Sequence, residues 1–396
     1  MPHKNIRLLT WFNFFTDFRL YNAIAIIYFA KVTGSFALGM SVFAITMISS
    51  ALLEVPTGIF SDKIGRKYTI VCGAAAAVIY AIFYALASTI IIEEMNIAFY
   101  ILAIGGVFEG LSRSFYSGNN DAFLYDTLAE QELHQEFSDH LGKTSSMFQL
   151  ALGISGVIGG FIASWSFGVI MWLSVLPQIA CLVLAFQMQE PKVHKHESSN
   201  NIYEHLAEAI QLFLKNPTLR LLGIASTWRF AFGEASYQFS SAFYSSLWPV
   251  WAVGLSKMLS NFLATFSFHF AGKIIKRFGP VPVLLFGSVY NRVLGFIAVI
   301  MNNVFSPVLL ALTSITFGTG TVAESEIFQK EISDHHRATM GSLASFAGNI
   351  LFGIVSIGVG LLADRFDTRT AFFIMQVLML PSLWWQWRLV GRVKEL

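Results

Sequence analysis

The chain has 396 residues, of which 55% are hydrophobic, 15% aromatic and only 13% charged. One soluble core cannot hide that much apolar surface, so the composition excludes an ordinary soluble protein and indicates a chain solvated by membrane lipid. The formal net charge of +2 gives no reason to expect a nucleic-acid partner.

Twelve segments are mostly apolar over about 20 residues, the length that one membrane-spanning helix needs. The connections between them are short and leave no room for a soluble domain. The sequence therefore predicts an all-α membrane protein with twelve transmembrane helices. In chain order these helices cover residues 8–30, 39–60, 68–91, 97–128, 142–166, 168–188, 219–246, 249–272, 280–302, 306–330, 341–363 and 369–390.

The distribution of Lys and Arg predicts the orientation. If the N-terminus is cytoplasmic, eighteen of these residues lie inside and three, Lys31, Arg365 and Arg369, lie outside. Cytoplasmic connections carry an excess of basic residues, so both termini are expected in the cytoplasm. The apolar run from Leu8 is too long for a cleavable signal and leads directly into the next helix. The expected location is the cytoplasmic membrane of a bacterium.

A compact basic turn joins the second and third predicted helices, with the sequence Gly58-Ile-Phe-Ser-Asp62-Lys63-Ile-Gly65-Arg66-Lys67. Its glycines allow a tight reversal, and its basic residues suit the cytoplasmic surface. A partial copy, Gly272-Lys-Ile-Ile-Lys276-Arg277-Phe-Gly279, joins the eighth and ninth helices. The duplication indicates a chain built from two similar halves.

A second repeated motif supports this division. Glu136-Phe-Ser-Asp139-His140 follows the fourth helix, and Glu331-Ile-Ser-Asp334-His335 follows the tenth. Six helices are therefore expected in each half. The predicted organisation is an N-terminal bundle over 1–188, a cytoplasmic linker over 189–218 with an amphipathic surface piece over 202–214, and a C-terminal bundle over 219–396.

The basic turn resembles the signature between the second and third helices of the major facilitator superfamily, a large family of secondary transporters. The resemblance implies two pseudo-symmetric six-helix bundles that rock about a central site, which is alternating access. It also implies a monomer, because each chain would hold a complete pathway.

The same resemblance assigns gating residues. In the family, the aspartate and arginine of this turn belong to a charge network that closes the cytoplasmic side, and Asp62 and Arg66 occupy those positions. Asp126 is the expected carboxylate for Arg66, and Glu54 lies near enough to join the network. A turn whose charges only set topology is the alternative interpretation.

Ionisable side chains inside a membrane helix are costly unless they face a partner or water. Here they gather on the first, fourth, seventh and tenth helices, which line the central cavity in this superfamily. Glu109 and Arg113 lie one helical turn apart, so they are expected on one face. Structural ion pairs between helices are the alternative for any single pair. The predicted substrate and proton cavity contains Asp17, Arg19, Glu109, Arg113, Asn120, Arg229, Glu234, Tyr237 and Glu324.

Three arginines in that set favour an anionic or zwitterionic small molecule as the substrate, because guanidinium groups bind carboxylates in a bidentate manner. A desolvated carboxyl group can carry a proton, so the predicted coupling ion is the proton. The prediction is a proton-coupled secondary transporter for a small charged or amphoteric organic solute. Two alternatives stay open: an efflux antiporter for amphiphilic compounds, and a uniporter or receptor on the same fold.

Other function classes lack the residues that they need. The chain has no phosphate-binding loop of the type G-x-x-x-x-G-K-S/T, so an ATP-driven pump is not expected. The buried charges are carboxylates and arginines, which do not form a nucleophile–base pair or a metal cluster. We therefore expect no enzyme activity, no cofactor and no metal site.

Overall fold

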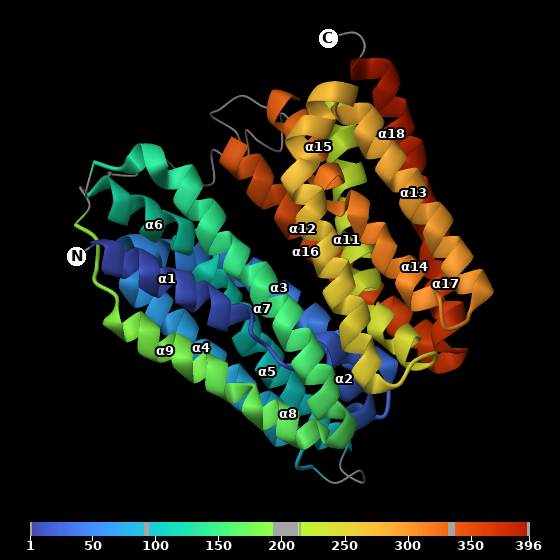
Figure 1. Cartoon of the computed structure of the whole chain (residues 1–396), viewed down its shortest axis with the longest axis horizontal. Coiled ribbons are helices and arrows are strands. Elements are labelled where there is room, and N and C mark those ends of the chain that lie inside the picture. The colour runs from blue at the N-terminus through green and yellow to red at the C-terminus, as the bar shows by residue number, and fades with distance from the viewer. Residues whose placement is uncertain are drawn as a thin grey trace. The chain divides into compact units, whose positions relative to one another are not determined.

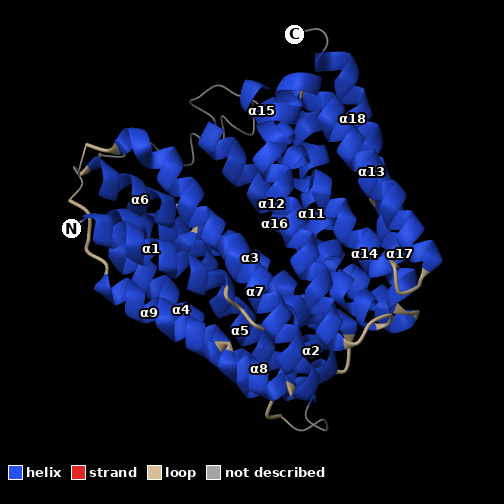
Figure 2. Cartoon of the chain, viewed as in Figure 1, coloured by secondary structure: helices blue, strands red, loops and turns tan. Residues whose placement is uncertain are grey.

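A computed structural model of the chain describes residues 2–90, 95–130, 132–192, 213, 215–331 and 337–393. Most of the predicted linker and the predicted surface piece over 202–214 lie outside these residues. The described part is almost wholly helical and contains no strand (Figure 2). This agrees with the predicted all-α class.

The elements follow one another along the chain in a simple order, coloured blue to red in Figure 1. They are α1 (Pro2–Asp17), η1 (Asn22–Ile24), α2 (Ala25–Thr33), α3 (Phe36–Ile64), α4 (Arg66–Ala87), α5 (Met95–Tyr116), α6 (Asn119–Ala129), η3 (His134–Glu136), α7 (Phe137–Trp165), α8 (Phe167–Leu173), α9 (Val175–Gln187), α11 (Pro217–Ser245), α12 (Val250–Phe278), α13 (Pro280–Met301), α14 (Ser306–Leu312), η4 (Thr313–Thr316), α15 (Phe317–Glu331), α16 (Arg337–Arg365), α17 (Thr368–Leu378) and α18 (Leu380–Val393).

The contacts divide the chain into two compact units. The first comprises Met1–Lys195 together with Trp248–Met258, and the second comprises His196–Leu247 and Leu259–Leu396. The start of α12 thus groups with the first unit, although the sequence analysis assigned it to the C-terminal bundle. The division into two six-helix bundles stays a prediction.

Eight helical segments of the described chain are long and apolar enough to cross a membrane. They correspond to the predicted second to sixth and ninth to eleventh helices. The first, seventh, eighth and twelfth predicted helices are not among them, so the number twelve stays a prediction. All four carry ionisable residues within their predicted bounds, among them Asp17, Arg229, Lys257 and Arg388, but so do the fourth and tenth predicted helices, which are among the eight.

Several of the predicted helices contain an interruption in the structure. In the first predicted helix, α1 ends at Asp17 and the chain resumes helical structure only at Asn22. In the fourth, Gly118 adopts φ +67° between α5 and α6, a backbone conformation that glycine reaches without a steric penalty. The tenth contains the 3-10 turn η4, while the sixth and twelfth are divided after Leu173 and Leu378.

A glycine on α7 explains how the first interruption is packed. A Cβ atom on Gly159 would collide with the backbone carbonyl of Leu20, which lies in the turn between α1 and η1. On the next residue, Gly160, a Cβ atom would lie 2.7 Å from the carbonyl oxygen of Trp251. Small residues let membrane helices approach this closely. The glycine-rich stretch of α7 is therefore a packing face.

Candidate functional site

Four ionisable residues of the first unit form what we call the buried charge cluster: Asp17, Arg19, Glu109 and Arg113. Glu109 lies on α5, and its Oε1 accepts a hydrogen bond from Nη1 of Arg19 at 2.6 Å. The same oxygen accepts bonds from Nε and Nη2 of Arg113 at 3.2 and 3.0 Å. The side chains of Arg19 and Glu109 are only 10% and 8% exposed. One buried carboxylate therefore binds two guanidinium groups, and the expected pairing of Glu109 with Arg113 is present.

Tyrosines of α4 complete the surroundings of this carboxylate. The hydroxyl of Tyr84 donates to the second oxygen of Glu109, Oε2, at 2.8 Å. The guanidinium of Arg19 lies 5.5 Å from the centre of the Tyr80 ring, within cation–π distance. Sequence reasoning missed both tyrosines, because nothing in an apolar run shows which neighbouring helix a tyrosine will face. Both oxygens of Glu109 are thus held by donors.

Arg19 also accounts for the end of α1. Its Nε donates to the carbonyl oxygen of Thr16 at 3.0 Å, so the side chain satisfies one of the carbonyls that a helix terminus leaves open. The sequence analysis placed Asp17 and Arg19 in one predicted helix, 8–30. In the structure Asp17 is the last helical residue and Arg19 lies in the turn that follows.

Asp17 differs from Glu109 in its partners. Its carboxylate has no hydrogen bond and no ion pair within 4 Å among the residues that the structure describes, although Arg19 lies two positions along the chain. Arg113 has 37% of its side chain exposed, more than Arg19 or Glu109. The cluster therefore contains one carboxylate that is held by two arginines and another without such a contact.

Asn120 does not continue the polar face of Glu109 and Arg113. The helix that carries those residues ends at Tyr116, and Asn120 belongs to α6, beyond the turn at Gly118. Its Oδ1 is buried and accepts no hydrogen bond within the described structure. The sequence analysis placed Glu109, Arg113 and Asn120 in one predicted helix, 97–128, which the structure divides at Gly118.

The basic turn forms a second polar cluster, which we call the turn cluster. Arg66 is the first residue of α4, and its Nη1 lies 3.1 Å from Oδ1 of Asp62. Its Nε lies 3.6 Å from Oδ2 of Asp126 on α6, so the expected pairing of Arg66 with Asp126 is present. Gly65, at φ +116°, makes the turn between α3 and α4. Glu54 does not contact Arg66 but accepts a hydrogen bond from Ser117 at 3.3 Å.

Three polar residues that the sequence analysis missed complete the turn cluster. Ser61 accepts from Nη1 of Arg66 at 2.9 Å and donates to Oδ1 of Asn119 at 2.6 Å. The carboxylate of Glu190, which follows α9, accepts the backbone N–H groups of Arg66 and Lys67 at 2.7 and 2.8 Å. A small cavity of about 230 Å³ lies beside Ser61, Arg66 and Asn119. One signal in the sequence could have indicated Glu190, because it is an acidic residue shortly after the sixth predicted helix.

In the second unit, Arg229 of α11 forms an ion pair with Glu324 of α15, and Ser226 donates to the same carboxylate. The two charged side chains are 27% and 12% exposed. Nε of Arg229 is buried and has no hydrogen-bond acceptor among the described residues. The structure thus brings together two of the predicted site residues from different helices.

The remaining predicted residues of the second unit lie further along α11. Oε1 of Glu234 accepts a hydrogen bond from Nε2 of Gln238 one turn away, at 2.8 Å. Tyr237 lies between them in sequence and is half-buried. Within the described chain, no three His, Cys, Asp or Glu side chains gather in a way that could hold a metal ion.

Comparison with known proteins gives a family match. A sequence profile described as the Major Facilitator Superfamily matches residues 8–351. An uncharacterized MFS-type transporter of Methanocaldococcus jannaschii is 22% identical over 340 residues, which make up 84% of this chain and 81% of that protein. An uncharacterized transporter of Buchnera aphidicola is 25% identical over 329 residues, 80% of this chain and 79% of that protein.

Solved structures show the same fold. The nucleoside transporter NupG superposes with a TM-score of 0.78 at 15% identity, over 97% of this chain and 98% of that one. A D-xylose–proton symporter superposes with a TM-score of 0.76 at 12% identity, over 98% and 97% of the two chains. Identities this low carry information about the fold alone.

Proposed function

The chain belongs to the Major Facilitator Superfamily, which is a family of transporters and not of enzymes, and from this premise we propose that it is a secondary active transporter. It moves a small charged or amphoteric organic solute across the membrane by alternating access, and protons drive the movement. The D-xylose–proton symporter that shares the fold supports proton coupling on this scaffold.

The observation that carries the proposal is the buried charge cluster. Two arginines inside a membrane helix bundle are costly to keep, and such residues mark substrate or ion pathways by default. Arg19 is buried against Glu109, whereas Arg113 keeps 37% of its side chain exposed. The exposed part of Arg113 can therefore bind an anionic group of the solute, while Glu109 holds the guanidinium in place.

Asp17 supplies the coupling step of this proposal. The formal charges of Asp17 and Glu109 cancel those of Arg19 and Arg113, so the cluster is neutral when both acids are ionised. Since Glu109 is held by two arginines and Tyr84, Asp17 is the carboxyl group that takes up the proton. Protonation leaves a net charge of +1, which favours an anionic group beside Arg113. Proton and solute then bind together, as symport requires.

The turn cluster is proposed as the cytoplasmic gate, with Asp62, Arg66, Asp126 and Glu54 as its charged members. Asp126 is 15% exposed and Asp62 is 61% exposed, so the contact of Arg66 with Asp126 is less screened by water. Asp126→Asn is expected to open the small cavity and to increase maleimide labelling of Ser114→Cys in a cysteine-free background. Asp62→Asn should change the labelling less. Equal labelling of all variants would indicate that the charges of the turn only set the topology and do not form a gate.

A corresponding role in the pathway is proposed for the second unit. Its pair of Arg229 and Glu324, with Glu234 and Tyr237 further along α11, supplies charges of both signs at membrane depth. Neutralising Glu324 would release Arg229 for a substrate. The proposal predicts that Glu324→Gln changes the apparent affinity for solute, measured as KM in transport, while Glu326→Gln serves as the neighbouring control.

The test is transport by the full chain in liposomes that contain a pH-sensitive dye, screened against pools of carboxylates, amino acids and amphiphilic cations. A solute-dependent proton flux is expected. Asp17→Asn should abolish that flux and leave solute exchange between equal pH values intact. Arg113→Ala should abolish both activities, and Glu132→Gln, at an exposed loop position, should change neither.

Two results would replace the proposal. Solute binding without flux across a maintained pH gradient would indicate a uniporter or receptor. Movement of amphiphilic cations against a proton flux in the opposite direction would indicate the efflux antiporter.

A further inference from the structure

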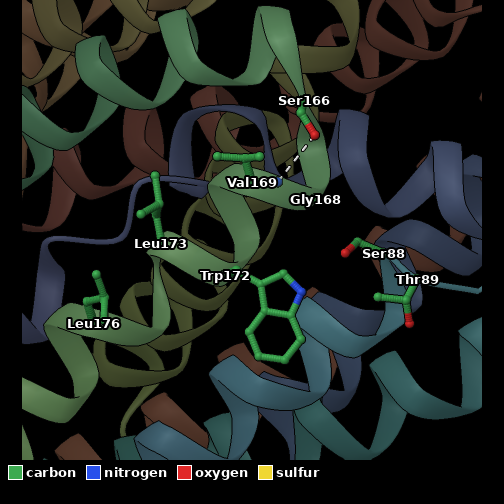
Figure 3. A pocket seen from close by; sticks show the side chains of 8 residues that line it. All are labelled: Ser88, Thr89, Ser166, Gly168, Val169, Trp172, Leu173 and Leu176. Atoms are coloured by element: carbon green, nitrogen blue, oxygen red, sulfur yellow. Dashed lines mark hydrogen bonds between the residues drawn. The ribbon is translucent and has the colours of Figure 1, made fainter.

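An open cavity of about 600 Å³ lies in the first unit, at the end of α4 and along α8 (Figure 3). The residues that line it are all uncharged. Ser88 and Thr89 donate to carbonyls of their own helix end, and Ser166 accepts the N–H of Val169, the bond that is dashed in Figure 3. This cavity therefore has no group that would select a ligand by its charge. A charged group without a counter-charge lies instead in the second unit.

Arg292 is an arginine at membrane depth that neither the proposed transport steps nor the gate uses. It lies near the middle of α13, which is long and apolar enough to cross a membrane. Arg292 lies off the lipid-facing stripe of this helix and shares a side with Gly295, three residues on, which is buried. The guanidinium therefore points into the second unit. The exposed apolar side chains of α13 recur every three or four residues, at Phe286, Val289, Val293, Ile297 and Ile300.

The contacts of Arg292 agree with this direction. Its Nη1 donates to Oε1 of Gln376 on α17 at 2.7 Å, and it also contacts Sδ of Met379, which follows that helix. Ser236 of α11 donates to the same sulfur at 3.8 Å. The guanidinium thus lies where side chains from α11, α13 and the end of α17 meet.

A glycine makes room for the contact between Arg292 and Gln376. A Cβ atom on Gly295 would lie 2.4 Å from Oε1 of Gln376 and 2.9 Å from its Cδ. A larger residue at this position would push the amide away from the guanidinium. Gln376 is only 3% exposed, so its amide is held inside the unit. The pairing of the amide with the guanidinium therefore depends on the backbone of α13 as well as on the two side chains.

Neither contact of Arg292 supplies a negative charge, because an amide oxygen and a thioether sulfur are neutral acceptors. No carboxylate lies within 4 Å of Arg292 among the residues that the structure describes. In the same unit, Arg229 has Glu324 as such a partner. The end of α17 does not replace it. Because α18 begins at Leu380, the negative end of one helix dipole adjoins the positive end of the next, and the two partial charges largely cancel.

The same two side chains carry N–H groups that the protein does not use. Nε and Nη2 of Arg292 and Nε2 of Gln376 have no acceptor within the described structure. Nε of Arg229 is also without an acceptor but is closed off from solvent, whereas these three nitrogens are not. Arginine has no acceptor atom, and the oxygen of Gln376 already accepts from it. Adjacent unused donors with a positive charge bind a small anion.

We propose that Arg292 and Gln376 form a binding site for a small monovalent anion, which supplies the counter-charge that the protein lacks. The anion is chloride or the carboxylate group of an organic acid, because both are compact acceptors for a guanidinium and an amide. The site lies within the second unit. It does not depend on transport or on proton coupling, since binding can be measured without a membrane gradient.

The test is thermal unfolding of the full-length protein in detergent. Chloride or acetate replaces a bulky morpholine sulfonate at constant ionic strength, so that only the identity of the anion changes. The thermal midpoint should rise by about 2 °C at an anion concentration about tenfold above Kd, because a bound ligand stabilises the folded state by mass action. A rise with chloride assigns an inorganic ion, and a rise with acetate alone assigns the carboxylate of an organic acid. No rise with either anion would overturn the proposal.

Gln376→Glu is the most specific variant, because it places a carboxylate where the amide oxygen now accepts from Arg292. The new ion pair takes the place of the bound anion. This variant should therefore unfold at a higher temperature than the wild type in the sulfonate buffer, and its midpoint should no longer depend on chloride or acetate. Arg292→Gln should also lose this dependence, whereas Arg292→Lys keeps the charge and should retain part of it.

Arg369→Gln is the matched control. Arg369 is an arginine of α17 that is exposed and donates to the carbonyl oxygens of Val299 and Ile300 at the end of α13. Its removal should leave the response to the anion as in the wild type. Loss of the response in Arg369→Gln as well as in Arg292→Gln would indicate a general effect of charge and would contradict the assigned site. A wild-type response in Gln376→Glu would contradict it as well.

Discussion

At the scale of single residues, the buried charge cluster depends on Glu109. Its carboxylate is the shared acceptor for Arg19, Arg113 and Tyr84, and it is almost completely removed from solvent. A buried ion pair adds little net stability, but removing one partner leaves the other charge uncompensated. The contribution of Glu109 to stability can therefore be measured only by removing its carboxylate.

Glu109→Gln is expected to lower the free energy of unfolding by about 3 kcal/mol, because it removes the one carboxylate that both guanidinium groups bind. Adding Arg19→Gln should restore part of the loss, so the double variant should be more stable than the sum of the two single losses predicts. Unfolding by detergent denaturation measures both effects.

The matched control for that cycle is Asp62→Asn, which removes a carboxylate that is 61% exposed and also pairs with an arginine. An exposed pair contributes at most about 1 kcal/mol. If Glu109→Gln were no more harmful than Asp62→Asn, or if the losses at Arg19 and Glu109 simply added, the cluster would not be an energetically coupled unit.

Some of these contacts could be predicted and others could not. Glu109 and Arg113 lie one turn apart, and helical spacing alone places them together. The pairing of Arg66 with Asp126 followed from the family resemblance. The partners supplied by Tyr84, Ser61 and Glu190 depend on which helices become neighbours. For Tyr84 and Glu190 a single sequence holds no such information, because each is separated from its partner by 25 or more residues. Ser61 is five residues from Arg66, but the turn at Gly65 that brings the two side chains together is not fixed by helical spacing.

At the scale of helices, the structure has helices at the predicted positions and interrupts several of them. The second predicted helix, 39–60, lies within α3, because an uninterrupted apolar run is a strong signal. The break after Asp17 has no glycine or proline to mark it. It is stabilised by Arg19, which makes a local contact with the carbonyl of Thr16 and a tertiary contact with Glu109 of α5. Hydropathy averages over about 19 residues and cannot detect an interruption of four.

The close approach of α7 to that break gives a prediction for the helix. Gly159→Ala should destabilise the protein by about 1–3 kcal/mol, because the added methyl group would collide with the carbonyl of Leu20 and force the break or the helix to move. Gly153→Ala, on the same helix, meets only Met258 Cγ at 4.0 Å and should be neutral or slightly stabilising. Thermal midpoints of the two variants give the comparison, and similar midpoints would contradict it.

The start of α17 has a cap whose strength depends on pH. Asp367 Oδ1 accepts the backbone N–H of Thr370 at 2.9 Å, and Oδ2 accepts its hydroxyl at 2.7 Å. These bonds favour the ionised form and hold the pKa of Asp367 below its ordinary value of 3.8. Because the folded pKa is the lower one, the cap stabilises the helix above pH 3.8 and is lost as the pH falls through the folded value.

Asp367→Ala should therefore weaken the first turn of α17 by about 1 kcal/mol at neutral pH. Asp367→Asn keeps a capping oxygen and should make the turn insensitive to acid. Hydrogen exchange of a peptide that contains Thr370 measures the opening of this turn, after correction for the intrinsic pH dependence of exchange. If protection against exchange fell as steeply with acid in Asp367→Asn as in the wild type, the pH dependence would belong to another group.

At the scale of the whole molecule, the predicted topology and the candidate site depend on two different sets of ionisable residues. Basic residues in the connections predict which side is cytoplasmic. Ionisable residues inside the helices, such as Asp17, Arg229 and Glu234, lower the hydropathy by which a spanning helix is recognised. Eight segments of the described chain meet that test. The first, seventh, eighth and twelfth predicted helices do not meet it, whereas the fourth and tenth do, although they carry Glu109, Arg113 and Glu324. Charge within a predicted helix therefore does not by itself decide whether the helix is recognised as a spanning one.

The predicted twelve-helix topology can be tested by asking whether an odd or an even number of membrane crossings separates two positions. Glu132 follows the fourth predicted helix and Val304 follows the ninth, so five crossings separate them and they should lie on opposite sides of the membrane. If either the seventh or the eighth predicted helix failed to cross, four crossings would remain and both positions would face the same side. In a background with Cys72 and Cys181 replaced by Ala, an impermeant maleimide applied to intact cells should label Val304→Cys and not Glu132→Cys. Labelling of both positions from one side would exclude the twelve-helix arrangement.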